Sequence, residues 1–113
     1  MATMNGTLKK WKNKNFFQKI SVASTDFEGS VVSWDFMSVG IALMVESNDP
    51  TDVVEYSFGP DPNGKLQVHG DMTPLMPSEG IIFDNRTESK IWFRRKAAGK
   101  SVVVRVESWR CDA

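Results

Sequence analysis

Short apolar stretches separated by turn signals follow one another along the chain from residue 16 onward. Eight stretches are predicted as strands, at residues 16–22, 30–36, 39–45, 53–58, 65–69, 81–83, 89–95 and 101–109. Turn signals recur roughly every 8–12 residues, which is the spacing of an all-β sandwich or barrel. No window shows the repeated i, i+3, i+4, i+7 apolar pattern of a helix. The pattern therefore predicts an all-β fold, a single-domain antiparallel β-sandwich of about eight short strands.

Residues 101–109 alternate most clearly. One side of this predicted strand carries Val102, Val104 and Val106, and the other side carries Val103, Arg105, Glu107 and Trp109. Successive side chains of a strand point to opposite faces, so the valine face is expected against a core. The opposite face is expected to meet water or another subunit. Residues 89–95 precede this strand across a turn at 97–100, and the two are predicted to pair as a hairpin.

The segments between the strands carry different turn signals. Residues 59–64 form the strongest loop signal, and Asn63-Gly64 suits a reversal that needs a positive φ. Residues 70–79 contain Pro74 and Pro77 and are predicted as an irregular connection.

Charge is unevenly distributed along the chain. Fourteen basic residues balance fourteen acidic ones, which argues against nucleic acid as a partner of the whole chain. Residues 1–23 carry five lysines and no acid, whereas residues 24–113 carry a formal charge of −5. We therefore divide the chain into a basic N-terminal arm with the start of the first strand, 1–23, and a β-sandwich domain, 24–113.

The arm has two interpretations, an extension that docks on an acidic partner and a frayed, solvated terminus. Its aromatic residues favour docking. The predicted arm contacts are Lys9, Lys10, Trp11, Lys12, Lys14, Phe16 and Phe17.

The residues needed for catalysis are scarce. The chain has one cysteine and one histidine, which excludes a disulfide framework, a cysteine zinc cluster and most nucleophile–base pairs. His69 lies two residues before Asp71, and a structural hydrogen bond at a strand end is favoured over a general base. The turns at 49–52 and 61–64 offer oxygen ligands for calcium, but neither has the spacing of a known calcium loop. We expect no enzyme activity, no cofactor and no metal. No apolar stretch or signal-like segment predicts a membrane association.

The tryptophans and the one tyrosine, Tyr56, offer two further interpretations. They could form a stacking platform for a carbohydrate or single-stranded nucleic acid, or they could fill the core or a subunit interface. The second is favoured in a small β domain. The candidate interface aromatics are Trp34, Trp92 and Trp109.

The second half of the chain carries a series of short motifs in a fixed order. They are Glu55-Tyr56-Ser57-Phe58, Val68-His69-Gly70-Asp71, Ile82-Phe83-Asp84-Asn85-Arg86, the run 89–95 and the closing run 102–109 with its Val-x-Val-x-x-Trp ending. This order resembles a group of small virion structural proteins of tailed bacteriophages. The resemblance covers about half of the chain and includes no catalytic signature.

The resemblance implies a non-enzymatic β-sandwich that assembles in many copies on a phage particle and is therefore located in the virion. It implies a capsid decoration or cement protein, with a tail or head–tail accessory protein as the alternative. The implied partners are the major capsid protein, other virion proteins and further copies of the chain in a homo-oligomer. A β-sandwich module that binds a glycan or a cell surface is the alternative from another class.

Overall fold

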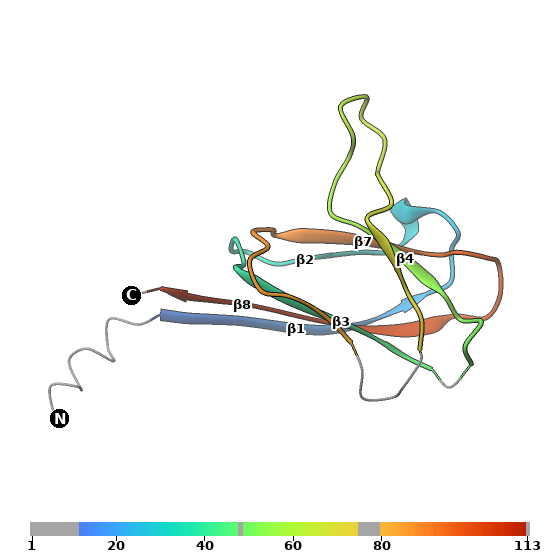
Figure 1. The fold of residues 1–113 in the computed structure, drawn as a ribbon, viewed down its shortest axis with the longest axis horizontal. Coiled ribbons are helices and arrows are strands. Elements are labelled where there is room, and N and C mark those ends of the chain that lie inside the picture. The colour runs from blue at the N-terminus through green and yellow to red at the C-terminus, as the bar shows by residue number, and fades with distance from the viewer. Residues whose placement is uncertain (1–11, 48, 75–79, 113) are drawn as a thin grey trace, which may run out of the picture.

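The described residues form eight strands in two antiparallel sheets that pack face to face (Figure 1). The computed structural model describes residues 12–47, 49–74 and 80–112, and for residues 12, 13, 111 and 112 it describes the backbone alone. The strands are β1 (Lys12–Val22), β2 (Val31–Ser33), β3 (Gly40–Glu46), β4 (Val54–Ser57), β5 (Gly70–Met72), β6 (Ile81–Phe83), β7 (Lys90–Arg95) and β8 (Val102–Asp112). A single turn of 3₁₀ helix, η1 (Phe27–Gly29), lies between β1 and β2.

The strand order confirms the predicted β-sandwich. Sheet A has the order β1-β8-β3-β6, and sheet B has the order β2-β7-β4-β5. Every pairing in both sheets is antiparallel. β8 therefore lies inside sheet A between β1 and β3, and β7 lies inside sheet B between β2 and β4.

The core lies between the inner faces of the two sheets. The three valines predicted to share one side of β8 are buried, at 3% exposure for Val102 and 0% for Val104 and Val106. The other core residues are Val22, Val32, Trp34, Ile41, Leu43, Val45, Val54, Tyr56, Phe58, Met72, Ile91 and Phe93. Burying a side chain of this size contributes roughly 1.5–3 kcal/mol relative to leaving it in water, so these residues hold the two sheets together.

The predicted hairpin between 89–95 and 101–109 is wrong. β7 pairs with β2 and β4, whereas β8 pairs with β1 and β3, so the two strands belong to different sheets. The reason is that each strand has a largely apolar inner face, with Phe93 on β7 and Val104 on β8 both at 0% exposure. Those faces are buried best when they oppose each other across the core, so residues 96–101 connect the sheets.

The strand predicted at 65–69 is reduced to one isolated antiparallel bridge, between Leu66 and Pro60, and the strand forms at β5 instead. Lys65, Gln67, Val68 and His69 are exposed, so this stretch has little apolar surface to bury against a sheet. It belongs to a loop that extends away from the sandwich (Figure 1). Gly64 takes the expected positive φ, 86°, at the turn of that loop.

Gly70 explains why the pairing resumes at β5. It lies directly opposite Tyr56 of β4, and a Cβ atom added there would come within 2.5 Å of the tyrosine hydroxyl oxygen. The absence of a side chain therefore lets the Tyr56 ring cross over the neighbouring strand. The segment predicted as irregular thus begins with a short edge strand.

Candidate interaction surface

The long ribbon formed by β1 and β8 is the most extended feature of the described chain. The two strands pair without interruption over eleven residue pairs, from Lys12 with Asp112 to Val22 with Val102. β3 pairs with β8 only between Val103 and Trp109, so three residue pairs of the ribbon continue beyond the rest of sheet A. Figure 1 shows this ribbon leaving the sandwich toward both ends of the chain.

β1 forms one edge of sheet A. Within the part of the chain that the structure describes, β8 pairs with one side of β1 and no strand pairs with the other. Lys14, Asn15, Gln18, Lys19 and Ser21 along this strand are exposed. A strand edge of this kind presents a row of unpaired N–H and C=O groups that another chain can pair with.

The outer face of sheet A carries unusual apolar exposure. We define it as the solvent-facing side formed by Phe17, Lys19, Ala42, Met44, Ile82, Arg105, Glu107 and Trp109. Phe17 is 50% exposed and Ile82 is 63% exposed. The two belong to one row across the sheet, in the order Phe17, Glu107, Ala42, Ile82. Large exposed apolar side chains gathered on one face are typical of interaction surfaces.

Charged side chains cross the same face beside this row. Glu46 of β3 accepts ion pairs from Lys19 of β1 and Arg105 of β8, each with a nitrogen 3.3 Å from Oε1. The Arg105 guanidinium also lies 5.2 Å from the ring centre of Phe17. Each partly exposed ion pair is worth about 0–1 kcal/mol, so the network mainly positions these side chains.

Trp109 completes the outer face of sheet A opposite Gly40. The two residues are direct partners in the β3–β8 register, and the indole lies over the glycine where a Cβ would otherwise stand. Trp109 is half-buried as a result, and its ring covers the backbone of β3.

The three candidate interface tryptophans lie in three different environments. Trp34 is 8% exposed, packs against Phe16 and donates from Nε1 to the Glu88 carbonyl at 3.2 Å, so it offers little surface to a second chain. Trp92 is half-buried on the outer face of sheet B, where Lys90 lies 5.0 Å from its ring centre. Trp109 is on the outer face of sheet A. The structure therefore does not bring these rings together into one platform.

The predicted arm residues divide into two groups. Lys9, Lys10 and Trp11 lie outside the described residues, and Lys12 is described only as backbone in β1. The rest belong to β1, where Lys14 and Phe17 are exposed and Phe16 packs against the core. The second half of the predicted arm is thus the edge strand of the sandwich.

His69 makes the structural hydrogen bond expected from its position. Its Nδ1 accepts from the backbone N–H of Phe58 at 3.0 Å, and its own N–H donates to the Tyr56 carbonyl at 2.8 Å. Asp71 is instead paired with Lys96, whose Nζ lies 2.9 Å from Oδ2. His69 and Asp71 therefore have separate partners.

The turn aspartates are also used within the chain. Asp49 accepts hydrogen bonds from the Thr51 hydroxyl at 2.7 Å and the Thr51 N–H at 2.9 Å, and these bonds lower the pKa of its carboxyl below the ordinary 3.8. Asp61 accepts from the N–H groups of Asn63 and Lys65, both at 2.9 Å. Among the described residues, no group of three or more His, Cys, Asp and Glu side chains could hold a metal ion.

A buried ion pair lies at the end of the sandwich where β7 ends. Arg95 and Asp52 are 5% and 3% exposed, and Arg95 Nη1 lies 3.2 Å from Asp52 Oδ1. Asp52 Oδ2 accepts from the Ser47 hydroxyl at 2.5 Å, and Arg95 Nη1 donates to the Lys100 carbonyl at 2.8 Å. These bonds connect the turn before β4 to the loop that joins the two sheets. The charges of Arg95 and Asp52 therefore serve the structure of the fold.

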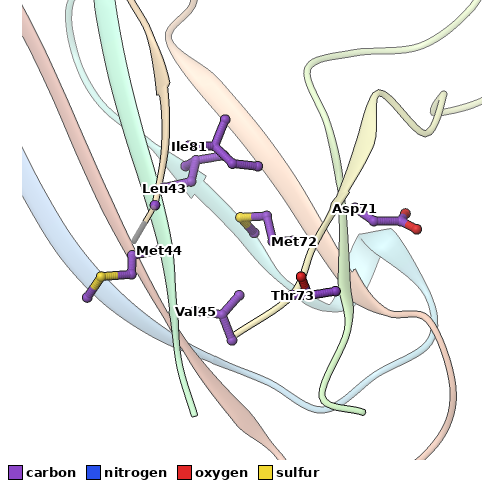
Figure 2. Close-up of a pocket in the computed structure, with 8 residues that line it drawn as sticks. Leu43, Met44, Val45, Asp71, Met72, Thr73 and Ile81 are labelled. Carbon is purple, nitrogen blue, oxygen red and sulfur yellow. The ribbon is translucent and has the colours of Figure 1, made fainter. Parts of the chain in front are cut away.

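A cavity of about 270 Å³ opens between the sheets near β3 and β5 (Figure 2). Figure 2 shows Met72, Val45, Leu43 and Ile81 around the opening, whereas Asp71 points away from it. Its lining is therefore mixed, with apolar side chains beside the polar Thr73.

Sequence reasoning missed Ile82 as a surface residue. The signal was present, because in a three-residue strand the middle side chain must point away from its two neighbours. The run Ile81-Ile82-Phe83 therefore had to expose at least one large apolar side chain on one face of the sheet.

In the described residues, no helix is both long enough and apolar enough to span a bilayer. No protein-family model matches the chain, and no curated protein matches it. Solved structures similar to it include that of a CooA mutant from Carboxydothermus hydrogenoformans, with 11% identity and a TM-score of 0.30 over 94% of this chain. The match covers 54% of the CooA chain, so the present chain spans about half of its length. A TM-score this low supports no inference about function.

Proposed function

We propose that the protein is a non-enzymatic assembly subunit, a capsid decoration or stabilising protein of a tailed-phage virion that docks on neighbouring subunits through the β1 side of the sandwich. The observation that carries the assembly role is the β1–β8 ribbon, whose eleven-residue β1 edge has no strand partner among the described residues and lies beside an exposed apolar row. The virion setting comes from the motif order of residues 55–109.

Charge supports docking at the same place. Residues 1–23, which include β1, carry five lysines and no acid, and the remainder of the chain has a formal charge of −5. A basic segment beside a strand edge attracts acidic neighbours, and this attraction weakens as salt screens it. The partners are the major capsid protein or other virion proteins, together with further copies of the chain.

The direct test is the composition of purified particles. Virions of the phage that encodes the chain are purified on a density gradient and analysed by quantitative mass spectrometry. The proposal expects the protein in many copies per particle. Its absence from intact, infectious particles would overturn the proposal. Electron cryomicroscopy of the same particles then separates a capsid position from a tail or head–tail position.

A matched pair of charge variants tests whether the protein docks through the basic segment 1–23. Lys9→Gln with Lys10→Gln removes two charges from the basic segment, and Lys65→Gln with Lys90→Gln removes two charges from elsewhere on the chain. Retention on particles that lack the native protein is measured by co-sedimentation at increasing salt. The first variant is expected to dissociate at lower salt than the native chain, and the second at the native salt concentration. Equal behaviour of the two variants would contradict docking through this end.

The glycan-binding alternative has less structural support. It requires exposed aromatic rings gathered on one face. Trp34 and Tyr56 are in the core and Trp92 lies on the outer face of sheet B, so the outer face of sheet A combines only the half-buried Trp109 with Phe17 among the described aromatics. A glycan-array signal that disappears in Trp92→Ala or Trp109→Ala would favour this alternative over the assembly role.

A further inference from the structure

The free edge of β1 is long and regular, and it carries lysines but no proline or bulge. Its eleven residues pair with β8 one to one, with no bulge and no proline to bend the strand. Natural proteins generally shorten, bulge or cover an edge of this length because it is a template for pairing. Within the described part of the chain nothing covers it.

Two copies of one chain can pair at such an edge only in defined registers. A two-fold axis makes the two strands antiparallel, so that residue i faces the residue equally far beyond the axis. Centring the axis on Phe17 pairs all eleven residues, because Lys12 then faces Val22 of the second copy. Any other centre shortens the pairing.

The same register keeps lysine away from lysine. Lys14 faces Ile20 of the second copy and Lys19 faces its Asn15. Centring the axis on Lys14 or Lys19 would instead place a lysine opposite itself, and like charges directly opposite each other destabilise a sheet. In the chain itself, the charge of Lys19 is already partly balanced by Glu46 at 3.3 Å.

Phe17, the residue at the centre of this register, is also an exposed aromatic residue of β1. Phe17 is 50% exposed on the outer face of sheet A, and the two-fold axis places it directly opposite Phe17 of the second copy. Facing side chains on neighbouring strands lie about 4.5–5.5 Å apart at Cβ, within contact of two phenyl rings. The apolar row from Ile82 to Phe17 then continues into the second copy.

We propose that two copies of this chain join through their β1 edges, in the register centred on Phe17, so that two A sheets become one eight-stranded sheet. Main-chain hydrogen bonds along the strand provide affinity, and the Phe17 contact and the lysine spacing select the register. This inference rests on the proposed assembly role, but it concerns the isolated chain and is tested without a particle.

Solution mass is the first measurement, by light scattering and sedimentation equilibrium of the full chain. The expected mass is that of a dimer of the 12.7 kDa chain. Phe17→Lys places two charges together on the axis and is expected to weaken dimerisation at least roughly tenfold, the effect of about 1.4 kcal/mol. Ile82→Lys is the matched control, since Ile82 is 63% exposed on the same face but lies on β6 at the far edge. It is expected to remain a dimer, and circular dichroism checks that both variants fold.

Cross-linking tests the register. In a Cys111→Ser background, Phe17→Cys places each thiol opposite its own copy, within the Cα separation of about 4.4–6.8 Å that a disulfide needs. Ser21→Cys is the control, because its two copies would lie eight residues apart along the strands, about 27 Å at 3.4 Å per residue. Rapid oxidation of the first variant and not the second is expected.

Salt distinguishes this dimer from docking of an acidic strand at the same edge. Two basic strands repel, so the dimer is expected to tighten between about 50 mM and about 500 mM NaCl, whereas an acidic partner would be released. A monomer at all salt and protein concentrations overturns the inference. A dimer that Ile82→Lys disrupts and Phe17→Lys does not also overturns it. Presence of the chain in purified virions is a separate result, so the assembly role can survive the failure of this interface.

Discussion

Gly40 and Trp109 illustrate how a single missing side chain shapes the surface of sheet A. The indole of Trp109 lies over Gly40, in the space that a Cβ atom would occupy. The contact covers the backbone of β3 at the end where the ribbon leaves the sheet. It is the counterpart of the contact between Gly70 and Tyr56 in sheet B.

Gly40→Ala is expected to destabilise the fold by about 1–3 kcal/mol, because the methyl group forces the Trp109 ring to move. Urea unfolding followed by circular dichroism measures the change. Trp109→Ala removes the obstacle, so the same glycine substitution in that background should cost much less. If the losses of stability from Gly40→Ala and Trp109→Ala simply add in the double variant, contact with the Trp109 ring is not the reason that position 40 requires glycine.

Tyr56 is the one tyrosine of the chain and reports on the core directly. Burial raises the pKa of its hydroxyl above the ordinary 10.0; Asp71 adds to the increase, and Arg86 opposes it. An unfolded chain therefore releases this proton at a lower pH than the folded chain does. The contribution to stability is complete below pH 10.0 and is lost as the pH rises through the folded pKa.

Near-ultraviolet absorbance of the phenolate measures this titration. The native protein should ionise above pH 10.0, and the protein in concentrated urea should ionise near 10.0. Tyr56→Phe removes the signal and confirms its origin. Native ionisation at or below pH 10.0 would show that the ring is not shielded as the structure indicates.

At the scale of elements, the Arg95–Asp52 pair joins the end of β7 to the turn that precedes β4. Both side chains are at most 5% exposed, so removing Asp52 leaves the buried Arg95 guanidinium without its carboxylate partner. Asp52→Ala is expected to cost about 3–5 kcal/mol. Glu46→Ala removes a carboxylate from the exposed pairs with Lys19 and Arg105 and should cost about 0–1 kcal/mol.

Thermal and urea unfolding compare these two variants. If Asp52→Ala does not fold, the double substitution Asp52→Leu with Arg95→Met is measured in its place. It replaces the buried ion pair by an apolar pair and should recover part of the stability. Equal losses for Asp52→Ala and Glu46→Ala would contradict the role of burial.

The alternation at residues 101–109 correctly predicted the buried face of β8, because a half-buried strand must alternate. Its partner could not be predicted, since the same valine face fits a hairpin neighbour or an opposing sheet equally well. Only the matching inner face of β7 decides for the opposing sheet. Residues 65–69 alternate weakly and are mostly exposed, so local pattern alone predicted a strand in a projecting loop.

The candidate interaction surface was only partly visible in the sequence for a similar reason. The lysines and Phe17 were recognised as a basic aromatic segment, but their position on an exposed edge depends on β8 lying between β1 and β3. Edges are a property of strand order, and strand order depends on contacts between residues distant in sequence. Trp34 was predicted at an interface because residue type alone does not separate a core indole from an exposed one.

At the scale of the whole molecule, sheet A depends on its last strand in the chain. β8 is the neighbour of both β1 and β3, and without it β1 has no partner in the described structure. A version containing residues 1–101 is therefore expected to be largely unfolded by circular dichroism and to lack a cooperative transition. Adding a synthetic peptide of residues 102–112 should restore the native spectrum. Cooperative unfolding of residues 1–101 alone would contradict this expectation.

The central position of β8 also has a consequence for biosynthesis. Of the described strands a ribosome delivers β1 first and β8 last, so β1 must wait until residues 102–112 are made before it pairs with β8. During that wait, neighbouring nascent chains on one messenger RNA expose the same unpaired strand, and such transient edges are prone to mispairing. Lys14 and Lys19 disfavour any mispairing that places two lysines opposite each other, whereas the register centred on Phe17 avoids that repulsion.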